Sequence, residues 1–299
     1  HLPSVVAVSA GCEIIISDDG STDGTGAWLA QAFPQVRGVT SLRNRGFGPA
    51  ANAGVAAARA PIVVLLNNDL ELAPGSLAPV AAWFNDASLF GLTFRAFDLA
   101  SRAFGTGGKL GHFRRGFWET WRNFECGSER AASFMLVGGF CAFRRQAFLD
   151  LGGFDPAFAP YYSEDLDLSY RARKRGWELG YEPRAVVFHA GSLSVKRHRN
   201  RFRRAAVIER NRLLFHWRNL DPDRGRQHLV WAHLLLLQMA LKGNFAYHAG
   251  YLQALARLPA VLRFRRTERA HWRRTDRELE LARGETSLSA RASAQQEPI

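Results

Sequence analysis

Three short apolar runs constrain the fold of this chain most strongly, because each ends abruptly in polar or acidic residues. The first is EIIISDD, from Glu13 to Asp19; the second is APIVVLLNNDLEL (60–72); and the third is AVVFHAGS (185–192). Short runs rich in β-branched residues are typical of strands buried on both faces. In sheets of such strands, ligands bind beyond the carboxyl ends, so the polar residues there are candidate site residues.

The segments around these runs predict helices. GTGAWLAQAF (24–33) and the Ala-rich GPAANAGVAAARA (48–60) separate the first two runs, and RRQAFLDLGG (144–153) and SEDLDLSYRARKRGW (163–177) precede the third. We expect Ser163 to cap the last of these helices with its side chain. Strands alternating with helices predict an α/β fold with a mainly parallel sheet.

Composition limits the class of protein further. The chain has 299 residues, 47% of them hydrophobic, which is enough for a full core. Its three cysteines, Cys12, Cys126 and Cys141, have no short spacing. This pattern argues against a zinc cluster or a disulfide scaffold and fits a reducing cytoplasm. There is no signal-peptide pattern.

The positive charge of the chain is concentrated in one segment. The net charge is +13, and residues 196–274 contain 19 Lys or Arg but only 4 Asp or Glu. Such a segment favours a polyanionic partner. We therefore expect an α/β domain over 1–195, a basic helical extension over 196–284 and a disordered tail over 285–299.

Five motifs occur in a fixed order and carry a resemblance to a known family. They are EIIISDDGSTDGT, RNRGFGPAANAG, LLNNDLEL, GGFDPAFAPYYSEDLDLSYRARKRGW and YEPRAVVFHAGS. Together they resemble family 2 glycosyltransferases with the GT-A fold, most closely bacterial rhamnosyl- and galactofuranosyl-type members. The resemblance covers roughly residues 13–192. It implies an inverting transfer of a sugar from a nucleotide-diphosphate donor to a cell-surface polysaccharide or a lipid-linked acceptor.

The residues after the first run have two interpretations. Asp18 and Asp19 suit a polar turn that leads into a helix. The resemblance instead implies that Asp19 hydrogen-bonds the nucleobase, because a carboxylate can accept the imide N–H of uracil or thymine, with Asp18 in support. It also assigns Asn44 and Asn68 to nucleotide contacts. The Ala-rich helix after Asn44 is explained equally well by packing.

The second and third runs supply the candidate metal ligands. Asn67-Asn68-Asp69 suits a turn after a strand, and His189 suits a histidine of the core. The resemblance makes Asp69 and His189 ligands of a divalent cation, Mn²⁺ or Mg²⁺, which neutralises the departing diphosphate. The motif has one carboxylate where an acid-rich triplet is usual.

The candidate base lies at the start of a predicted helix. Glu164 and Asp165 suit the first turn of a helix, where the helix dipole favours acids. The resemblance makes Asp165 the general base that deprotonates the acceptor hydroxyl. Glu164, Gly138 and Gly139 are assigned to the loops that contact donor and acceptor, with the glycines allowing close approach.

The basic extension and the N-terminus complete the expectations. The extension suits a helical bundle with a solvated face, but we favour an anchor on an anionic membrane surface, with Trp231, Phe245 and Trp272 as apolar contacts. No nucleic-acid module supports a nucleic-acid partner. The expected location is the cytoplasmic, inner face of the plasma membrane. Only twelve residues precede Glu13, so we expect the family's first strand and helix to be missing.

Two other functions remain open at this point. One is a nucleotide-sugar-binding protein with impaired catalysis. The other is a basic membrane- or nucleic-acid-binding protein whose α/β domain serves only as a scaffold.

Overall fold

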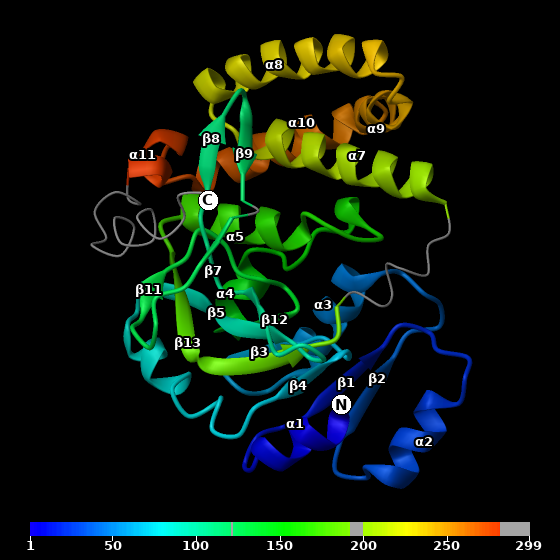
Figure 1. Cartoon of the computed structure of the whole chain (residues 1–299), viewed down its shortest axis with the longest axis vertical. Coiled ribbons are helices and arrows are strands. Elements are labelled where there is room, and N and C mark those ends of the chain that lie inside the picture. The colour runs from blue at the N-terminus through cyan, green and yellow to red at the C-terminus, as the bar shows by residue number, and fades with distance from the viewer. Residues whose placement is uncertain (121, 192–199, 282–299) are drawn as a thin grey trace.

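The computed structural model describes residues 1–120, 122–191 and 200–281. At its centre is a seven-stranded sheet in which five strands follow the order β11-β13-β5-β12-β3, with β4 on β13 and β6 on β5 (Figure 1). The strands of this sheet are β3 (Ile62–Leu66), β4 (Leu70–Leu72), β5 (Leu89–Asp98), β6 (Phe104–Thr106), β11 (Ala131–Ala132), β12 (Phe140–Arg144) and β13 (Glu178–His189). The second apolar run of the sequence therefore forms two strands, β3 and β4.

The α/β fold is confirmed, but the prediction of a mainly parallel sheet is wrong. Only β13 and β5 pair in parallel in the central sheet. Strand β12 is antiparallel to both β3 and β5, and β4, β6 and β11 also pair antiparallel with their neighbours. The reason lies between β5 and β12, where the described chain forms short strands and no helix. A parallel return requires a long crossover, usually a helix, so β12 returns antiparallel.

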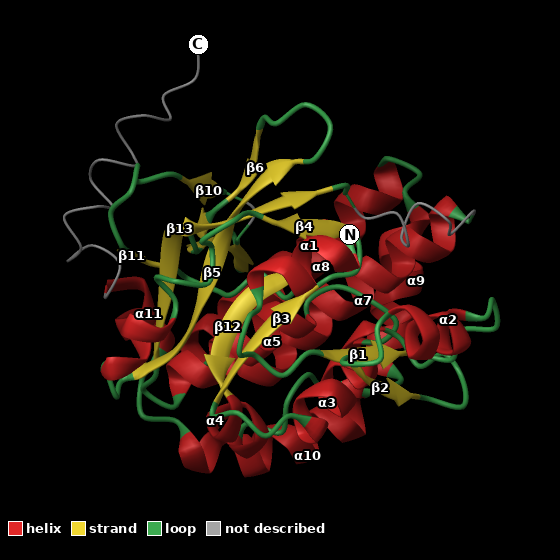
Figure 2. Ribbon diagram, turned by 90° about the horizontal axis from the view of Figure 1, so that it is seen from below, coloured by secondary structure: helices red, strands yellow, loops and turns green. Residues whose placement is uncertain are grey.

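The first apolar run forms a separate small sheet. Strand β1 (Ile15–Asp18) pairs in parallel with β2 (Arg37–Thr40), and both lie to one side of the central sheet (Figure 2). Helices α2 (Thr25–Ala32) and α3 (Phe47–Ala57) follow these strands as predicted. The residues before Glu13 form a helix, α1 (Leu2–Val8), whose valines pack against the core beside β4.

The remaining elements of the α/β part are short strands and helices that lie between or after the strands of the central sheet. Two small antiparallel pairs join β7 to β10 and β8 to β9. The elements are η1 (Ala81–Asn85), β7 (Gly108–Lys109), β8 (His112–Arg114), β9 (Phe117–Glu119), β10 (Asn123–Phe124), α4 (Arg145–Asp150), η2 (Pro156–Phe158) and α5 (Glu164–Lys174). Figure 1 shows the β8–β9 hairpin extending from the α/β part to the C-terminal helices.

The basic extension is helical, as predicted, and covers α5 on the side away from β1 and β2 (Figure 1). Its elements are α7 (Arg201–Asn219), α8 (Pro222–Leu241), α9 (Phe245–Leu255), α10 (Leu258–Glu268), η3 (Arg269–His271) and α11 (Asp276–Leu281). The proposed boundary at residue 195 and the tail over 285–299 lie outside the described residues. Within the described ranges, no helix is long and apolar enough to span a bilayer.

The helices share one apolar core with the α/β part. Trp118, Phe134 and Tyr170 belong to the same buried cluster as Leu213 and Phe215 of α7. Burial of each such side chain contributes about 1.5–3 kcal/mol. The extension therefore packs over a continuous apolar surface onto α5, the helix that carries the candidate base Asp165.

Buried charges also join α5 to the C-terminal helices. The Lys174 side chain is inaccessible to solvent, and its Nζ lies 2.6 Å from Oδ1 of Asp221 and 2.5 Å from Oδ1 of Asp276. Asp167 of the same helix accepts hydrogen bonds from Arg171 Nε and Asn219 Nδ2. Because a buried charge without a partner is strongly destabilising, these contacts fix α5 against α7 and α11.

The predicted cap of α5 differs from the structure. Ser163 is the residue at the N-cap position, but its side chain accepts no hydrogen bond from the helix, so the predicted capping contact is wrong. Ser163 has φ 74° and Tyr162 has φ 71°, both in the left-handed region that residues with a side chain seldom adopt. This backbone directs the loop away from the geometry in which a serine caps.

Candidate active site

The two candidate metal ligands lie side by side at the carboxyl ends of their strands. Asp69 follows β3, and His189 is the last residue of β13. The Nε2 atom of His189 lies 3.0 Å from Oδ1 of Asp69, and both side chains are mostly buried, with 22% and 12% exposed. The pair is set by the β4–β13 register, which places His189 opposite Leu70.

This pair fits a divalent cation that takes its other ligands from the substrate. A carboxylate oxygen and an imidazole nitrogen suit Mn²⁺, and Mg²⁺ is bound in many enzymes by one or two carboxylates plus phosphates. Across residues 1–120, 122–191 and 200–281, there is no group of three or more His, Cys, Asp or Glu side chains that could hold a metal ion, so this pair would need ligands from the substrate. The donor set is thus compatible with a metal–diphosphate complex.

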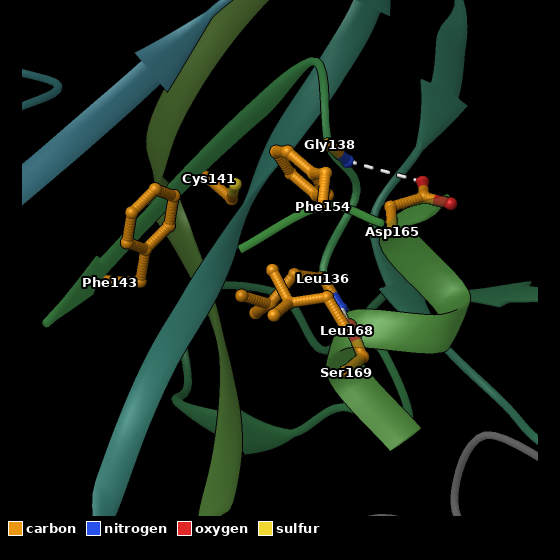
Figure 3. Close-up of a pocket in the computed structure, with 8 residues that line it drawn as sticks. All are labelled: Leu136, Gly138, Cys141, Phe143, Phe154, Asp165, Leu168 and Ser169. Atoms are coloured by element: carbon orange, nitrogen blue, oxygen red, sulfur yellow. Dashed lines mark hydrogen bonds between the residues drawn. The ribbon is translucent and has the colours of Figure 1, made fainter. Parts of the chain in front are cut away.

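The candidate base is held by two backbone N–H groups. Asp165 Oδ2 accepts a hydrogen bond from Gly138 N at 3.2 Å, and its Oδ1 accepts one from Leu166 N at 2.8 Å. The carboxyl group therefore has a fixed orientation at the first turn of α5. Figure 3 shows it above a small space between the sheet and α5 that is lined mainly by apolar side chains.

Burial raises the pKa of both acids at this helix start. The pKa of Glu164 rises to about 8, mainly because its side chain is only 9% exposed and secondly because of the Asp165 charge. Burial also raises the pKa of Asp165, opposed by the hydrogen bonds from Gly138 and Leu166 and by the Lys109 charge. Oε2 of Glu164 is buried and has no hydrogen-bond partner. At neutral pH, the two carboxyl groups therefore tend to share one proton rather than ionise together.

The carboxylates of Asp18, the last residue of β1, and of the next residue, Asp19, accept hydrogen bonds from backbone N–H groups. Asp18 is buried, and its Oδ1 accepts a hydrogen bond from Ser21 N. Asp19 accepts hydrogen bonds from the backbone N–H groups of Arg45 and Gly46. The Asp18 contact closes the turn after β1 and matches the turn interpretation of the sequence. The Asp19 contacts instead hold the distant loop that leads into α3, and base recognition by Asp19 stays a prediction.

Glycines join the loops that carry these residues. Asn67 N donates to Gly139 O at 2.8 Å, and a Cβ on Gly139 would lie 2.7 Å from Asn67 Nδ2. The neighbouring Gly138 donates to Asp165. The Gly138-Gly139 pair thus connects the end of β3, which leads to Asp69, to the start of α5.

A second set of close contacts connects the Asp19 loop to the same place. A Cβ on Gly46 would lie 2.9 Å from Pro160 O, in the loop before α5, and Gly46 has φ 92°. The Phe47 ring lies 3.4 Å from the position of a Cβ on Gly138. Asp19 and Asp69 in their loops, Asp165 in α5 and His189 at the end of β13 are therefore connected through these contacts, and together they form one rim of the α/β part. The exposed Asn44 and Asn68 lie in the loops before α3 and after β3.

Two features of this rim are absent from the sequence prediction. Lys109 of β7 is half-buried, and burial lowers its pKa against the attraction of Asp165. Its only signal in the sequence is that it is the first lysine of the chain. The second feature is the pair of left-handed residues, Tyr162 and Ser163, directly before the two acids. Strained backbone of this kind is concentrated at functional sites.

Several bacterial proteins have sequences similar to this chain. Two proteins named N-acetylglucosaminyl-diphospho-decaprenol L-rhamnosyltransferase, from the CDC 1551 / Oshkosh and H37Rv strains of Mycobacterium tuberculosis, are 33% identical to this chain over 203 residues. The match covers 59% of this chain and 66% of each relative. A protein named Uncharacterized protein y4gI from Sinorhizobium fredii is 27% identical over 68% of this chain and 24% of its own length.

Solved structures show the same fold at low sequence identity. GalNAc-T7 with UDP, GalNAc and Mn²⁺ superposes with a TM-score of 0.50 and 20% identity, over 59% of this chain and 37% of that protein. S. aureus TarS 1-349 in complex with UDP-GlcNAc superposes with a TM-score of 0.50 and 14% identity, over 80% and 68%. Both likenesses concern the fold alone.

The family follows from the sequence match and the fold together. Residues 4–152 match the profile of Glycosyl transferase family 2, which covers β1, β3 and the Gly138-Gly139 loop. The ordered motifs, the GT-A-like fold and the identity to the named rhamnosyltransferases agree with that match. The chain therefore belongs to glycosyl transferase family 2, a family of enzymes.

Proposed function

We propose that this protein transfers a sugar, with inversion at the anomeric carbon, from a nucleotide-diphosphate donor to a lipid-linked or polysaccharide acceptor. The name of the M. tuberculosis relatives, which includes a decaprenol diphosphate, supports a lipid-linked acceptor. The acceptor and the chemistry would place the protein at the cytoplasmic face of the plasma membrane. The single observation that carries the proposal is the set of contacts that connects Asp165 to the Asp69–His189 pair. Gly138 donates to Asp165, and the neighbouring Gly139 accepts a hydrogen bond from Asn67, two residues before Asp69.

Asp165 is the candidate general base. Its carboxyl group is oriented by two backbone N–H groups, and its raised pKa brings it closer to the range in which a base is efficient at neutral pH. It accepts the proton of the acceptor hydroxyl, whose oxygen then forms the bond to the anomeric carbon while the bond to the diphosphate breaks. Burial raises the pKa of the neighbouring Glu164 to about 8, which disfavours a second negative charge beside this carboxylate at neutral pH.

Asp69 and His189 would hold a divalent cation. When bound, such an ion supplies positive charge to the departing diphosphate. The chain's own contribution is the fixed pair of donor atoms, oriented by the β4–β13 pairing. Asp19 shapes the loop of Asn44 and Arg45 toward the nucleotide, and its remaining lone pairs are available to a base N–H.

The test is a screen of the full chain with UDP-, GDP- and dTDP-sugars in Mn²⁺ or Mg²⁺. We expect one donor to release its nucleoside diphosphate, faster in the presence of a polyprenyl-diphosphate-linked N-acetylglucosamine. NMR of the product should show the inverted anomeric configuration. A retained configuration would reject the single displacement.

A catalytically impaired nucleotide-sugar-binding protein is the second candidate. It is favoured by the Asp19 carboxylate, which already accepts three backbone hydrogen bonds, and by the two-residue metal site. Titration calorimetry separates the two candidates: donor binding without release of nucleoside diphosphate in any acceptor mixture would support this second function.

A further inference from the structure

We propose that the exposed apolar face of α8, together with the loop to α9, docks on the surface of an anionic lipid bilayer. This inference rests on the proposed function and names the surface through which the protein would bind the membrane. It rests on the arrangement of side chains in the C-terminal helices, and its test needs neither a nucleotide sugar nor an acceptor.

The outer face of α8 is apolar along its length. Val230, Leu234, Leu237 and Leu241 recur at intervals of three and four residues, which places them on one side of a helix. They are 59%, 48%, 66% and 90% exposed. The opposite side, with His228 and Ala232, is buried against the rest of the protein. Exposed apolar residues arranged in a stripe mark a binding surface more often than isolated ones do.

The stripe continues into the loop between α8 and α9. Leu241 and Phe245, which is 59% exposed, flank the exposed Lys242 and the turn at Gly243, which has φ 64°. Apolar side chains on either side of a cation suit the boundary between lipid headgroups and acyl chains. Figure 1 shows α8 as the outermost layer of the molecule, farthest from β1 and β2.

The charge around this face selects an anionic partner. From Arg224 to Thr267 the sequence contains no acidic residue but has seven Lys or Arg. The β8–β9 hairpin adds the exposed Arg115, whose guanidinium carbon lies 6.0 Å from the centre of the Trp231 ring. Each Lys or Arg close to an anionic membrane strengthens binding through electrostatic attraction.

A membrane surface explains these features better than a second copy of the chain would. Two copies facing each other through this surface would bring like charges together, which costs binding energy. The described helices are not apolar enough to span a bilayer, so α8 would lie in the plane of the membrane. Of the three aromatic contacts expected from the sequence, Trp231 and Phe245 are exposed. Trp272 is half-buried, with its ring centre 4.3 Å from Lys174 Nζ, and it is not part of the proposed surface.

The test is flotation of the full chain with two kinds of vesicle. One contains phosphatidylcholine alone, and the other also contains about one third phosphatidylglycerol, an anionic lipid. We expect binding to the anionic vesicles to be at least tenfold tighter and to weaken as salt increases. The variant L234Q/L237Q should lose more than tenfold of this binding without any change in net charge. The matched control is Trp28→Gln on α2, an exposed aromatic residue of the opposite part of the molecule, which should bind as the unmodified chain does.

Two results would overturn the inference. One is equal binding of L234Q/L237Q and the unmodified chain to anionic vesicles, with both giving the same circular dichroism. The other is a dimer in sedimentation that the same variant dissociates, with no vesicle binding, because the face would then join two copies. Neither result depends on sugar transfer, so a failed docking surface is distinguishable from a failed proposed function.

Discussion

His189 Nε2 and Asp69 Oδ1 lie 3.0 Å apart although 120 residues separate them in the chain. The antiparallel pairing of β4 with β13 produces this approach, because it places Leu70 opposite His189. A carboxylate and an imidazole at hydrogen-bond distance can serve as an ion pair or as two ligands of one metal ion. The distinction is experimental.

We predict that Asp69→Asn and His189→Gln each raise the Mn²⁺ or Mg²⁺ concentration that gives half-maximal release of nucleoside diphosphate by about tenfold or more, since loss of groups that only orient a ligand already costs 10–100-fold. The measurement is a metal titration of each variant after removal of metal with EDTA. If the pair is only structural, the variants will melt at lower temperature while their metal dependence is unchanged.

The two acids of α5 should respond differently to loss of charge. Asp165→Asn removes the candidate base, so we expect the turnover rate to fall about 100-fold or more at pH 7. Glu164→Gln replaces a group whose pKa is about 8, and which is therefore mostly neutral at pH 7, by a neutral group of the same shape. Its rate at pH 7 should be close to that of the unmodified protein.

The pH profile extends this comparison. A base works only when ionised, so the rate should fall as the pH drops through the raised pKa of Asp165. Above pH 8, Glu164 ionises in the unmodified chain but has no counterpart in Glu164→Gln, so the two profiles should diverge there. Equal loss of activity in Asp165→Asn and Glu164→Gln at pH 7 would contradict the separate roles of the two acids.

Lys174 should be essential for stability. Lys174→Met leaves Asp221 and Asp276 without their cation in a buried position, and loss of one partner of such a network costs about 3–5 kcal/mol. Urea denaturation measures the free energy of unfolding. The control is Arg226→Gln, whose ion pair with Asp223 is exposed at the surface and should contribute nothing measurable. An equal effect of both changes would refute the importance of the buried cluster.

Two stacked histidines predict acid sensitivity. His216 and His228 lie with ring centres 4.7 Å apart, and burial lowers the pKa of His228 to about 4. An unfolded histidine binds a proton below a pH of about 6.5, so between pH 6.5 and pH 4 the unfolded state gains protons that folded His228 does not. Stability should therefore fall with decreasing pH, by up to about 1.4 kcal/mol per pH unit for each histidine.

The matched variant for this effect is His228→Asn, which retains a donor for Gly116 O but does not titrate. Its free energy of unfolding, measured at pH 7, 6 and 5, should depend less steeply on pH than that of the unmodified chain. An identical slope would show that His228 does not contribute to acid sensitivity.

The network around Lys174 also determines how the extension can be studied. A chain that ended at Ser194 would lose Asp221, Asp276 and the apolar residues of α7 that cover Tyr170. For this reason, point variants on the outer face of α8 test membrane docking more cleanly than truncation does.

The sequence by itself determined the elements whose patterns are local. The runs that end at Asp18 and near Asp69, the helix that begins at Glu164 and the basic helices after residue 200 all follow from residue types at fixed spacing. The alternation of strand and helix patterns predicted the α/β fold, and the order of five motifs identified the family.

Only the tertiary structure decided the sheet directions, the Asp69–His189 contact, the position of Lys109 near Asp165 and the buried partners of Lys174. The residues between β5 and β12 carry no pattern that distinguishes an antiparallel return from a crossover. Ion pairs such as Lys174–Asp276 join residues that are distant in sequence, and no local periodicity encodes which distant charges meet. The pKa of Glu164 likewise depends on how completely its neighbours exclude water, which is a property of packing in three dimensions.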